Sequence, residues 1–233
     1  HEFGNIRVGS QTHMDINGYH FEFVSSRDAD LRDPIATAAL FDKFKPTAVI
    51  HLAARVGGLF ANMADNLGFL EDNLEINSNV IKNCHRLGVK RAVFCLSTCV
   101  FPADAPLPIS EDSLHHGPPH PSNEGYAQSK RIMECQVRFY REAYGYKNWV
   151  CVIPTNVYGP GDNFDLNTAH VVPALIHKMV AAFLDSNNNN PQLIVSGSGT
   201  PLRQFIYSQD LAEIILIILS HPNELEFSSI VCC

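Results

Sequence analysis

A tyrosine and a lysine four positions apart, Tyr126 and Lys130, are the residues whose types and spacing most directly indicate chemistry. Residues at this spacing share one face of a helix, so the lysine ammonium can lie near the tyrosine phenol. A neighbouring cation lowers the pKa of a phenol from its usual value of about 10, which predicts an acid or base usable near neutral pH. The same pair also fits a solvated helix face, and the spacing alone leaves both interpretations open.

A serine and a cysteine, Ser97 and Cys99, follow the apolar run 92–96. This run predicts a buried strand that ends at the substrate-binding edge of a sheet. In an extended chain the two side chains point to the same side, so the Ser97 hydroxyl could bind a substrate carbonyl beside Tyr126. Cys99 alone is equally typical of a small buried hydrophobic residue.

The elements that must position these residues alternate along the chain. The predicted strands are 21–24, 48–52, 92–96, 149–153 and 193–195, and the predicted helices are 34–44, 66–87, 126–144, 171–184 and 210–219. Asp33 and Pro34 are typical of a helix start, and the asparagine run 187–190 predicts a surface loop. The pattern predicts an α/β fold with a doubly wound parallel sheet, which binds ligands beyond the carboxyl ends of its strands.

Composition narrows the function further. The chain has 233 residues, 17 lysines and arginines against 24 aspartates and glutamates, a formal net charge of -7 and no basic run, which argues against nucleic acid or an anionic membrane surface as a partner. No apolar run reaches the roughly 20 residues of a membrane-spanning helix. The seven cysteines lack the spacing of a disulfide framework, which favours reduced thiols and a cytoplasmic protein.

Ser97, Tyr126 and Lys130 match the catalytic triad of the extended short-chain dehydrogenases, so the chain resembles that family of NAD-dependent epimerases and dehydratases. Segments 51–54 and 154–160 resemble its cofactor-facing strand end and its nicotinamide-side loop. Four further segments resemble the GDP-L-fucose synthases within that family: 56–59, 97–102, 161–164 and 170–173. The resemblance runs from about residue 24 to residue 219 and implies a Rossmann-type fold that binds NADP(H).

The resemblance implies synthesis of GDP-L-fucose, by 3,5-epimerisation and then NADPH-dependent 4-reduction of GDP-4-keto-6-deoxy-D-mannose. Cys99 and His170 would be the acid/base pair that inverts C3 and C5. Ser97 and Tyr126 would stabilise the enolate oxygen, Tyr126 would supply the proton during reduction, and Lys130 would hold the nicotinamide ribose. His170 taken alone is also typical of a capping or loop histidine.

Further binding residues are implied by the same resemblance. The cofactor-binding positions are Arg27, Asp30, Leu31, Ala53, Ala54, Leu96, Ser97, Lys130, Pro154, Thr155, Asn156, Val157 and His170, and the substrate-binding positions are Asn156, Lys178 and Arg203. Lys178 and Arg203 would bind the substrate diphosphate, and Arg27 would bind the NADP 2′-phosphate. Each of these three cations could instead be a solvated surface residue.

The chain also departs from the family pattern. We expect an NADP-binding domain over 1–160 and, over 161–233, part of a substrate-binding domain interleaved with the last Rossmann elements. The first strand and its Gly-x-x-Gly-x-x-Gly loop are missing, since Gly4, Gly9 and Gly18 form no such fingerprint, and the C-terminal part of the substrate domain is absent. A chain truncated at both ends is expected to bind NADPH poorly. Ser196 stands where the family often has an aromatic residue beside the guanosine.

The resemblance implies a homodimer through helices near 66–87 and 126–144, with a GDP-sugar as substrate. Three histidines, His115, His116 and His120, lie in a proline-rich loop without carboxylate or cysteine ligands at a set spacing, so no metal site is expected. Two alternatives stay open. One is another nucleotide-sugar epimerase or reductase of the same fold, and the other is a catalytically silent, truncated form that only dimerises.

Overall fold

The computed structural model describes residues 13–16, 18–106, 108–166, 168–184, 192–195, 197–200, 202–221 and 224–233. The predictions that concern Gly4, Gly9, the loop 187–190 and Ser196 lie outside these described residues.

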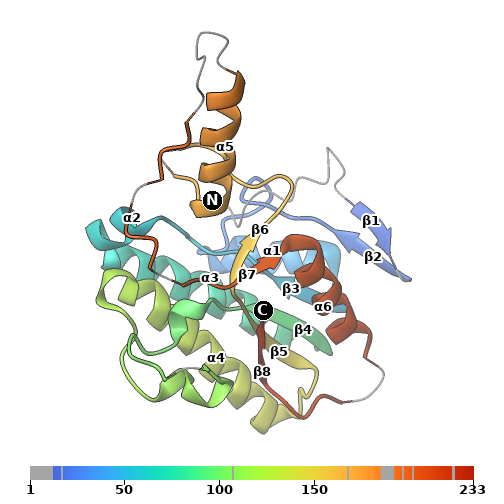
Figure 1. The fold of residues 1–233 in the computed structure, drawn as a ribbon. Helices are drawn as coiled ribbons and strands as arrows, with labels where there is room; N and C mark the ends of the chain where they lie inside the picture. Colours follow the sequence, from blue (N-terminus) through green and yellow to red (C-terminus); the bar gives the residue numbers. More distant parts are fainter. Residues whose placement is uncertain are drawn as a thin grey trace.

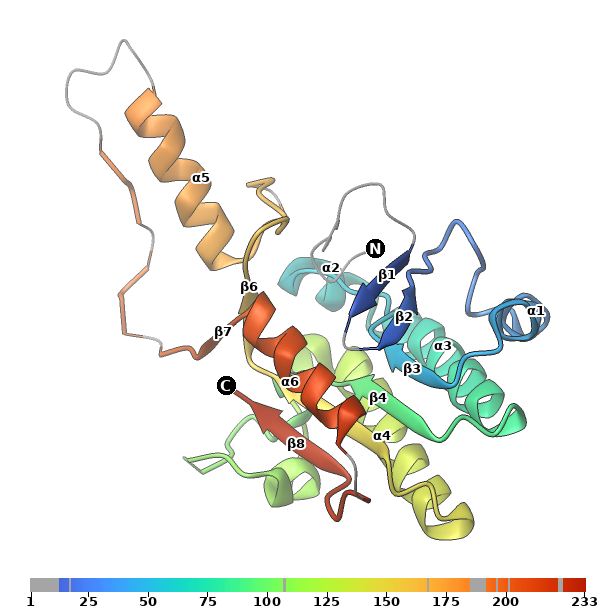
Figure 2. The same ribbon diagram turned by 90° about the vertical axis from the view of Figure 1, so that its right-hand side faces the viewer.

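Four parallel strands form the central sheet, in the order β3 (Ala48–His51), β4 (Arg91–Cys95), β5 (Trp149–Pro154) and β8 (Ser229–Cys232). The helices around it include α1 (Pro34–Phe44), α2 (Leu59–Ala64), α3 (Asn66–Arg86), α4 (Glu124–Tyr144) and α6 (Ser208–Ser220). Figures 1 and 2 show α3 and α4 on one face of the sheet and α6 on the other. The predicted fold class, an α/β protein with a parallel sheet covered on both faces, is confirmed.

Two hydrophobic cores follow from the alternation of side chains along β4 and β5. Phe94 and Trp149 belong to a buried cluster that includes residues of α1, α3 and α4. Val93 and Val150, one position along each strand, belong to a second cluster with residues of α6. Because successive strand residues point to opposite faces, a sheet covered on both sides requires apolar residues at successive positions, and β4 after Arg91 and β5 have them.

Local signals in the sequence define several helices accurately. Asp33 caps α1 by accepting hydrogen bonds from the backbone N–H groups of Ile35 and Ala36, and Pro34 occupies the first turn. A glycine marks the end of another helix: Gly145 caps the C-terminus of α4, and its φ of 71° is the left-handed conformation that glycine adopts without strain. The start predicted for α1 is confirmed.

The predicted strand 21–24 differs from the observed one. β1 (His13–Ile16) and β2 (Tyr19–Glu22) form an antiparallel pair of their own, with Gly18 at a φ of 79° in the turn between them. The residues Asn17-Gly18 in the sequence are a strong hairpin signal that the strand assignment overlooked. The prediction of a strand over 21–24 was therefore wrong, because the observed strand covers 19–22.

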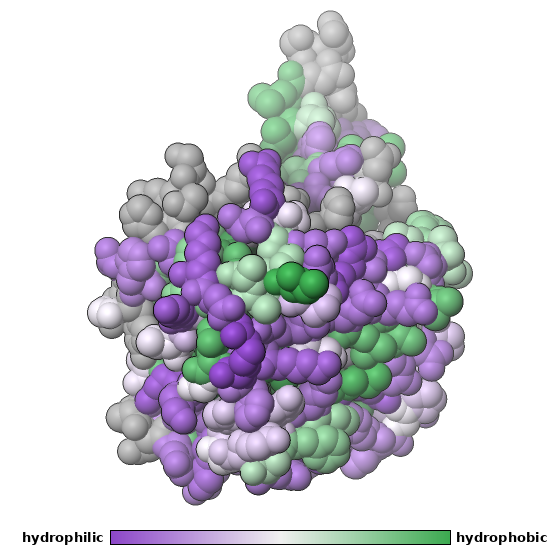
Figure 3. Space-filling model, turned by 180° about the vertical axis from the view of Figure 1, so that it is seen from behind, coloured by the Kyte–Doolittle hydropathy of each residue, from purple (hydrophilic) through white to green (hydrophobic). Residues whose placement is uncertain are grey.

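A long arm projects from the body of the molecule and carries α5 (Val171–Leu184), which was predicted correctly (Figure 1). The predicted strand 193–195 is wrong, because these residues form no ladder and Ile194 is 76% exposed. The strand instead is β7 (Phe205–Tyr207), which pairs in parallel with β6 (Asn156–Tyr158). Figure 3 shows hydrophobic residues on the surface of the arm, in line with the exposure of Phe183 and Leu184.

Three short 3₁₀ helices complete the described elements that matter for the site: η1 (Thr98–Val100), η2 (Glu111–His115) and η3 (Pro121–Asn123). Among the described residues, no helix has both the length and the apolar character needed to cross a membrane.

Candidate active site

Tyr126 and Lys130 lie on the first turns of α4 and are both buried, with exposures of 8% and 0%. The Lys130 Nζ donates a hydrogen bond of 2.8 Å to the Cys95 carbonyl at the end of β4, and it lies 5.7 Å from the centre of the Tyr126 ring. A solvated helix face is therefore excluded. A buried lysine beside a buried tyrosine at the carboxyl end of a central strand is typical of a functional site.

The expected effect of Lys130 on the phenol is wrong for this structure. Burial, and then the neighbouring Cys99 and Cys95, raise the pKa of Tyr126 well above its usual value. Burial also lowers the pKa of Lys130. Burial is the largest cause of both shifts, because desolvation disfavours the charged form of each group. The phenol therefore keeps its proton at neutral pH, which is the form that a proton donor needs.

Ser97 and Cys99 lie beside this pair but not in the extended geometry that the sequence suggested. Residues 98–100 form η1, with Ser97 as its N-cap, and the Cys99 backbone N–H lies 3.5 Å from the Ser97 Oγ. The prediction that both side chains project from one extended strand was wrong, because the chain turns directly after β4. Burial raises the pKa of the Cys99 thiol to about 11, against the lowering effect of Ser97 and Lys130.

Two contacts fix α4 against its surroundings. Gly125 lies so close to α3 that a Cβ there would stand 1.9 Å from the Asn66 carbonyl oxygen, and its backbone N–H donates to the Asn66 side chain at 2.9 Å. Further along α4, the Arg131 Nε donates to the Val100 carbonyl of η1 at 2.6 Å. The first contact positions Tyr126, and the second ties the segment of Cys99 to the same helix.

His51, at the end of β3, is a buried residue to which the resemblance gave no role of its own. Its Nε2 lies 2.9 Å from the Asn77 Oδ1, and because an amide oxygen only accepts, Nε2 carries the proton. Burial, and then the charge of Lys130, lower the pKa of His51 to about 4. The imidazole is therefore neutral at physiological pH.

The stability of the chain should depend on pH through His51. The unfolded chain takes up a proton near pH 6.5 and the folded chain only near pH 4, so the free energy of unfolding should fall as the pH drops through this window. The loss should reach up to about 3 kcal/mol. Urea denaturation of wild type and of His51→Gln at pH 7 and pH 4.5 measures the effect, with the exposed His116→Gln as control. An equal pH dependence in His51→Gln and in the control would contradict this assignment.

The remaining cofactor positions predicted at the strand ends lie together along one edge. Ala53 and Ala54 follow β3, and Leu96 follows β4 and is fully buried. After β5, the Thr155 backbone N–H donates to the Cys232 carbonyl at 3.0 Å, while its buried Oγ1 has no hydrogen-bond partner in the described part of the chain. Pro154 ends β5, and Asn156 and Val157 begin β6.

Arg27, Asp30 and Leu31 lie in the loop between β2 and α1. Arg27 is exposed. Asp30 accepts from the Arg32 guanidinium, which lowers the pKa of that carboxyl group, and the Leu31 carbonyl accepts from Asn79 of α3 at 2.9 Å. These contacts hold the loop against α3.

Several positioning residues were missed by the sequence interpretation. Asn73 accepts the Arg55 backbone N–H at 2.8 Å and donates to the Arg55 carbonyl at 2.9 Å, which fixes the segment after β3. Arg55 also pairs with Asp65 and Asp72. Asn73 and Asn77 occupy buried positions four apart on α3, and asparagines within the apolar stripe of a helix were the signal that could have revealed them.

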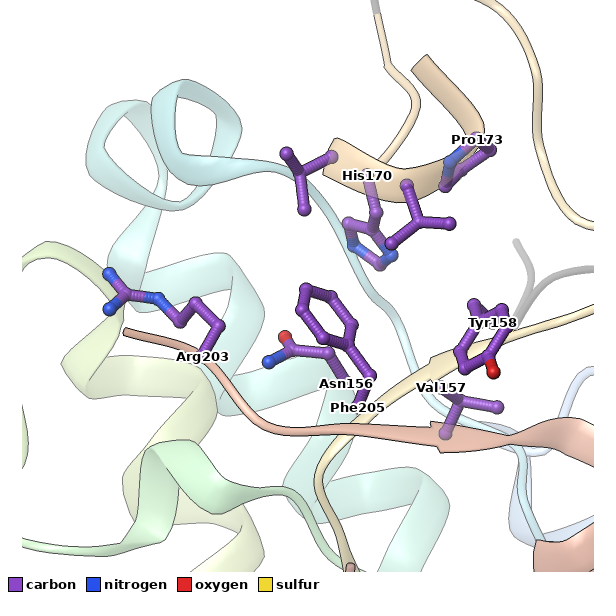
Figure 4. A pocket seen from close by; sticks show the side chains of 9 residues that line it. Asn156, Val157, Tyr158, His170, Pro173, Arg203 and Phe205 are labelled. Atoms are coloured by element: carbon purple, nitrogen blue, oxygen red, sulfur yellow. The ribbon is translucent and has the colours of Figure 1, made fainter. Parts of the chain in front are cut away.

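His170, Arg203 and Asn156 come together in a separate pocket of about 110 Å³ (Figure 4). The pocket lies where β6, β7 and the start of α5 meet, and Phe205 and Pro173 supply apolar walls. Figure 4 shows the His170 ring and the Asn156 amide on the same side of the β6–β7 pair. The described lining residues include neither Lys178, which is exposed on α5, nor Cys99 or Tyr126. The structure thus groups the predicted residues into two clusters.

Comparison with known proteins identifies the fold family. The model of the NAD dependent epimerase/dehydratase family matches residues 9–232. The chain is 50% identical over 203 residues to the GDP-L-fucose synthase of Dictyostelium discoideum, covering 87% of this chain and 62% of that protein. It is 48% identical over 207 residues to a probable GDP-L-fucose synthase of Drosophila melanogaster, covering 88% of this chain and 64% of that protein.

Solved structures of related proteins have the same fold as this chain. The chain superposes on a GDP-L-fucose synthetase from Naegleria fowleri bound to NADP with a TM-score of 0.78 at 44% identity, covering 91% of this chain and 67% of that one. A GDP-mannoheptose C4 reductase from Campylobacter jejuni with NADP bound gives a TM-score of 0.79 at 27% identity, covering 90% and 70%. The chain thus spans somewhat less than two thirds of its curated relatives in length, and it belongs to the NAD dependent epimerase/dehydratase family.

Proposed function

We propose that this chain carries the catalytic centre of a GDP-L-fucose synthase, which epimerises GDP-4-keto-6-deoxy-D-mannose at C3 and C5 and then reduces C4. The observation that carries the proposal is the buried Tyr126–Lys130 pair beside Ser97 and Cys99. The pair lies in a sequence half identical to a protein named GDP-L-fucose synthase.

The cofactor we propose is NADP(H), which supplies the hydride for C4 when bound. The edge formed by the strand ends fits such a group, because Ala53 and Ala54 are small and the buried Thr155 hydroxyl has no partner within the described residues. Lys130 is the candidate for binding the nicotinamide ribose. Tyr126, which holds its proton at neutral pH, is the candidate for protonating the C4 oxygen.

Epimerisation requires proton transfers at carbon, which we assign to residues other than Lys130 and the Tyr126 proton donor. The 4-keto group acidifies the C–H bonds on C3 and C5, so a base can remove each proton and an acid can return one from the opposite face. Cys99 and His170 are the candidates for these two proton transfers. Ser97 and Tyr126 are the candidates for hydrogen bonds to the oxygen of the enolate, which exists after the first transfer and before the second.

Asn156, Lys178 and Arg203 are the candidates for binding the GDP-sugar. The overall charge of the chain is negative, so the diphosphate requires a local cation. Arg203 is better supported than Lys178, because it lines a pocket together with Asn156 and His170.

We further propose a cytoplasmic homodimer. The seven cysteines lack the spacing of a disulfide framework, which suits a reducing compartment. The outer surface of α4 exposes Ile132 and Phe139 one above the other at a spacing of seven residues, and α3 packs beside this helix. An exposed apolar stripe of this kind suits a second copy of the same helix pair. The domain boundary at residue 160 stays a prediction.

A second candidate function is 4-keto reduction without epimerisation. It is favoured by the likeness to a GDP-mannoheptose C4 reductase, and by the high pKa of Cys99, which leaves little thiolate at neutral pH. Both candidate functions share the roles of Tyr126 and Lys130.

The test uses a full-length chimera, in which the parts of the Dictyostelium discoideum relative beyond the aligned segment are added to this chain. GDP-4-keto-6-deoxy-D-mannose and NADPH are supplied, and NMR identifies the product. GDP-L-fucose is the expected product. A GDP-6-deoxyhexose with unchanged C3 and C5 would support the second candidate instead, and a chimera that folds but turns over nothing would overturn both.

A further inference from the structure

Three potential metal ligands that the candidate active site does not use meet between η2 and α4. The His115 Nε2 lies 2.9 Å from the Glu134 Oε2 and 3.9 Å from the Cys135 Sγ, and the three ligand atoms all lie within 4.8 Å of one another. His115 ends η2, whereas Glu134 and Cys135 are neighbours on α4. The sequence argument against a metal here, that no carboxylate or cysteine accompanies the histidine, therefore does not hold for His115.

The ligand set has the chemistry of a zinc site. Zinc takes imidazole nitrogen, carboxylate oxygen and thiolate sulfur, whereas calcium and magnesium favour oxygen alone. Tetrahedral zinc with ordinary bond lengths keeps such atoms about 3.4–3.6 Å apart. The observed separations bracket this range, so shifts on the order of one ångström would bring all three atoms into the first coordination sphere. Since His115 is exposed over 44% of its side chain, a water molecule can reach the fourth position.

Both elements that supply the ligands are held firmly. In η2, Leu114 is buried in the main core, and Glu111 accepts a 2.8 Å hydrogen bond from the backbone N–H of Val231 in β8. In α4, Glu134 is buried, and its other oxygen, Oε1, lies 3.4 Å from the Arg138 Nε. Glu134 can therefore offer Oε2 to a metal while Oε1 keeps Arg138 as its partner. Ligands presented by rigid elements lose little entropy on binding.

The charges around the cluster allow a divalent cation. Glu134 and a Cys135 thiolate supply two negative charges, which balance those of the metal. Arg138 and Arg131 both act electrostatically on Cys135, and Glu142 lies 3.7 Å from Arg138 on the exposed side. Burial, and then the charge of Glu134, raise the pKa of the Cys135 thiol against the lowering effect of Arg138, whose Nη2 donates to the Cys135 Sγ at 3.7 Å. The thiol is therefore protonated without a metal, and its proton must leave when the metal binds.

We propose that His115, Glu134 and Cys135 form a zinc site that links η2 to the helix carrying Tyr126 and Lys130. The proposal rests on the geometry of these three side chains and does not depend on the proposed function.

The test is a zinc titration of the chain, in competition with a chromophoric chelator, after treatment with a stronger chelator. One zinc ion should bind per chain, and Cys135→Ser and His115→Gln should each weaken the affinity by at least tenfold, since even loss of an outer-sphere partner commonly costs about 10–100-fold. Cys233→Ser and His116→Gln are the matched controls, because both wild-type residues are exposed and lie outside the cluster. Both controls should bind zinc as the wild type does.

Cobalt supplies an independent readout, because Co²⁺ bound to a thiolate shows a charge-transfer absorption in the near ultraviolet. This band should appear in the wild type and in Cys233→Ser and should disappear in Cys135→Ser. Zinc should also raise the Tm of the wild type but not that of Cys135→Ser. The proposal is overturned if the His115→Gln, Cys135→Ser double variant binds zinc as tightly as the wild type, or if the cobalt band persists in Cys135→Ser.

Discussion

Replacing Tyr126 by Phe should lower the rate of NADPH-dependent reduction by about 10²–10⁴-fold, the range typical of a lost general acid. The substitution removes the phenol oxygen and keeps the ring, so the packing at the start of α4 should survive. The hydroxyl is the candidate proton donor to the C4 oxygen, and its raised pKa keeps it protonated at neutral pH. Substrate binding should change much less than turnover, because the loss falls on the transition state.

The measurement mixes an excess of the full-length chimera with keto sugar and NADPH and follows the NADPH absorbance through a single turnover. Tyr144→Phe is the matched control, because Tyr144 lies at the exposed end of the same helix. A normal rate is expected for the control. Reduction by Tyr126→Phe at the wild-type rate would remove Tyr126 from the mechanism and leave its burial beside Lys130 as a feature of packing.

The sequence was most informative where local and long-range signals agree. Asp33 and Pro34 identify the start of α1 by themselves. The continuous apolar runs of β4 and β5 predict a sheet that is covered on both faces, and the two cores agree with this. The Tyr126–Lys130 spacing was ambiguous alone, and burial decided it. Family resemblance could select the residues, but it could not supply the pKa of Tyr126, which depends on how much solvent the folded chain excludes.

The errors have a common physical origin. Leu193 to Val195 have the composition of a strand, yet a strand needs a partner, and the ladder forms instead between β6 and β7. Ser97 to Cys99 were treated as extended because they follow a strand, whereas η1 begins there. The cluster of His115, Glu134 and Cys135 joins residues about twenty positions apart, and such proximity arises only from the packing of η2 on α4. Pairing and packing partners are the information that local pattern lacks.

Exchange of carbon-bound hydrogen should separate a fucose synthase from a simple reductase. If Cys99 and His170 move protons, the full-length chimera should transfer deuterium from D₂O into C3 and C5 of the keto sugar even without NADPH. Cys99→Ser should slow the exchange at least about 100-fold, since a serine hydroxyl is a far weaker base than a thiolate. Cys233→Ser controls for the loss of a thiol elsewhere in the chain.

The pH dependence of this exchange follows from the environment of Cys99. Burial raises the pKa of its thiol to about 11, so the thiolate that acts as base is a small fraction of the protein at pH 7 and grows with pH. Exchange that starts with Cys99 should therefore rise about tenfold per pH unit between pH 7 and pH 9. The residual exchange catalysed by Cys99→Ser should not show this rise with pH, because a serine hydroxyl does not titrate between pH 7 and pH 9.

The proposed acid and base of epimerisation lie in different clusters of the candidate site, so a variant that lacks both residues tests the assignment. Cys99 lies with Ser97 and Tyr126 at the end of β4, whereas His170 lies with Asn156 and Arg203 at the start of α5. A base and an acid on different elements can serve opposite faces of one sugar ring, which inversion requires. His170→Gln should then hinder the return of the proton while leaving Tyr126 and Lys130 intact, so that unepimerised sugar is reduced and released. Full exchange at C3 and C5 in the Cys99→Ser, His170→Gln double variant would show that neither residue handles these protons, so other residues would have to be the acid and the base. A wild-type chimera that reduces the keto sugar without any exchange would instead be a reductase only.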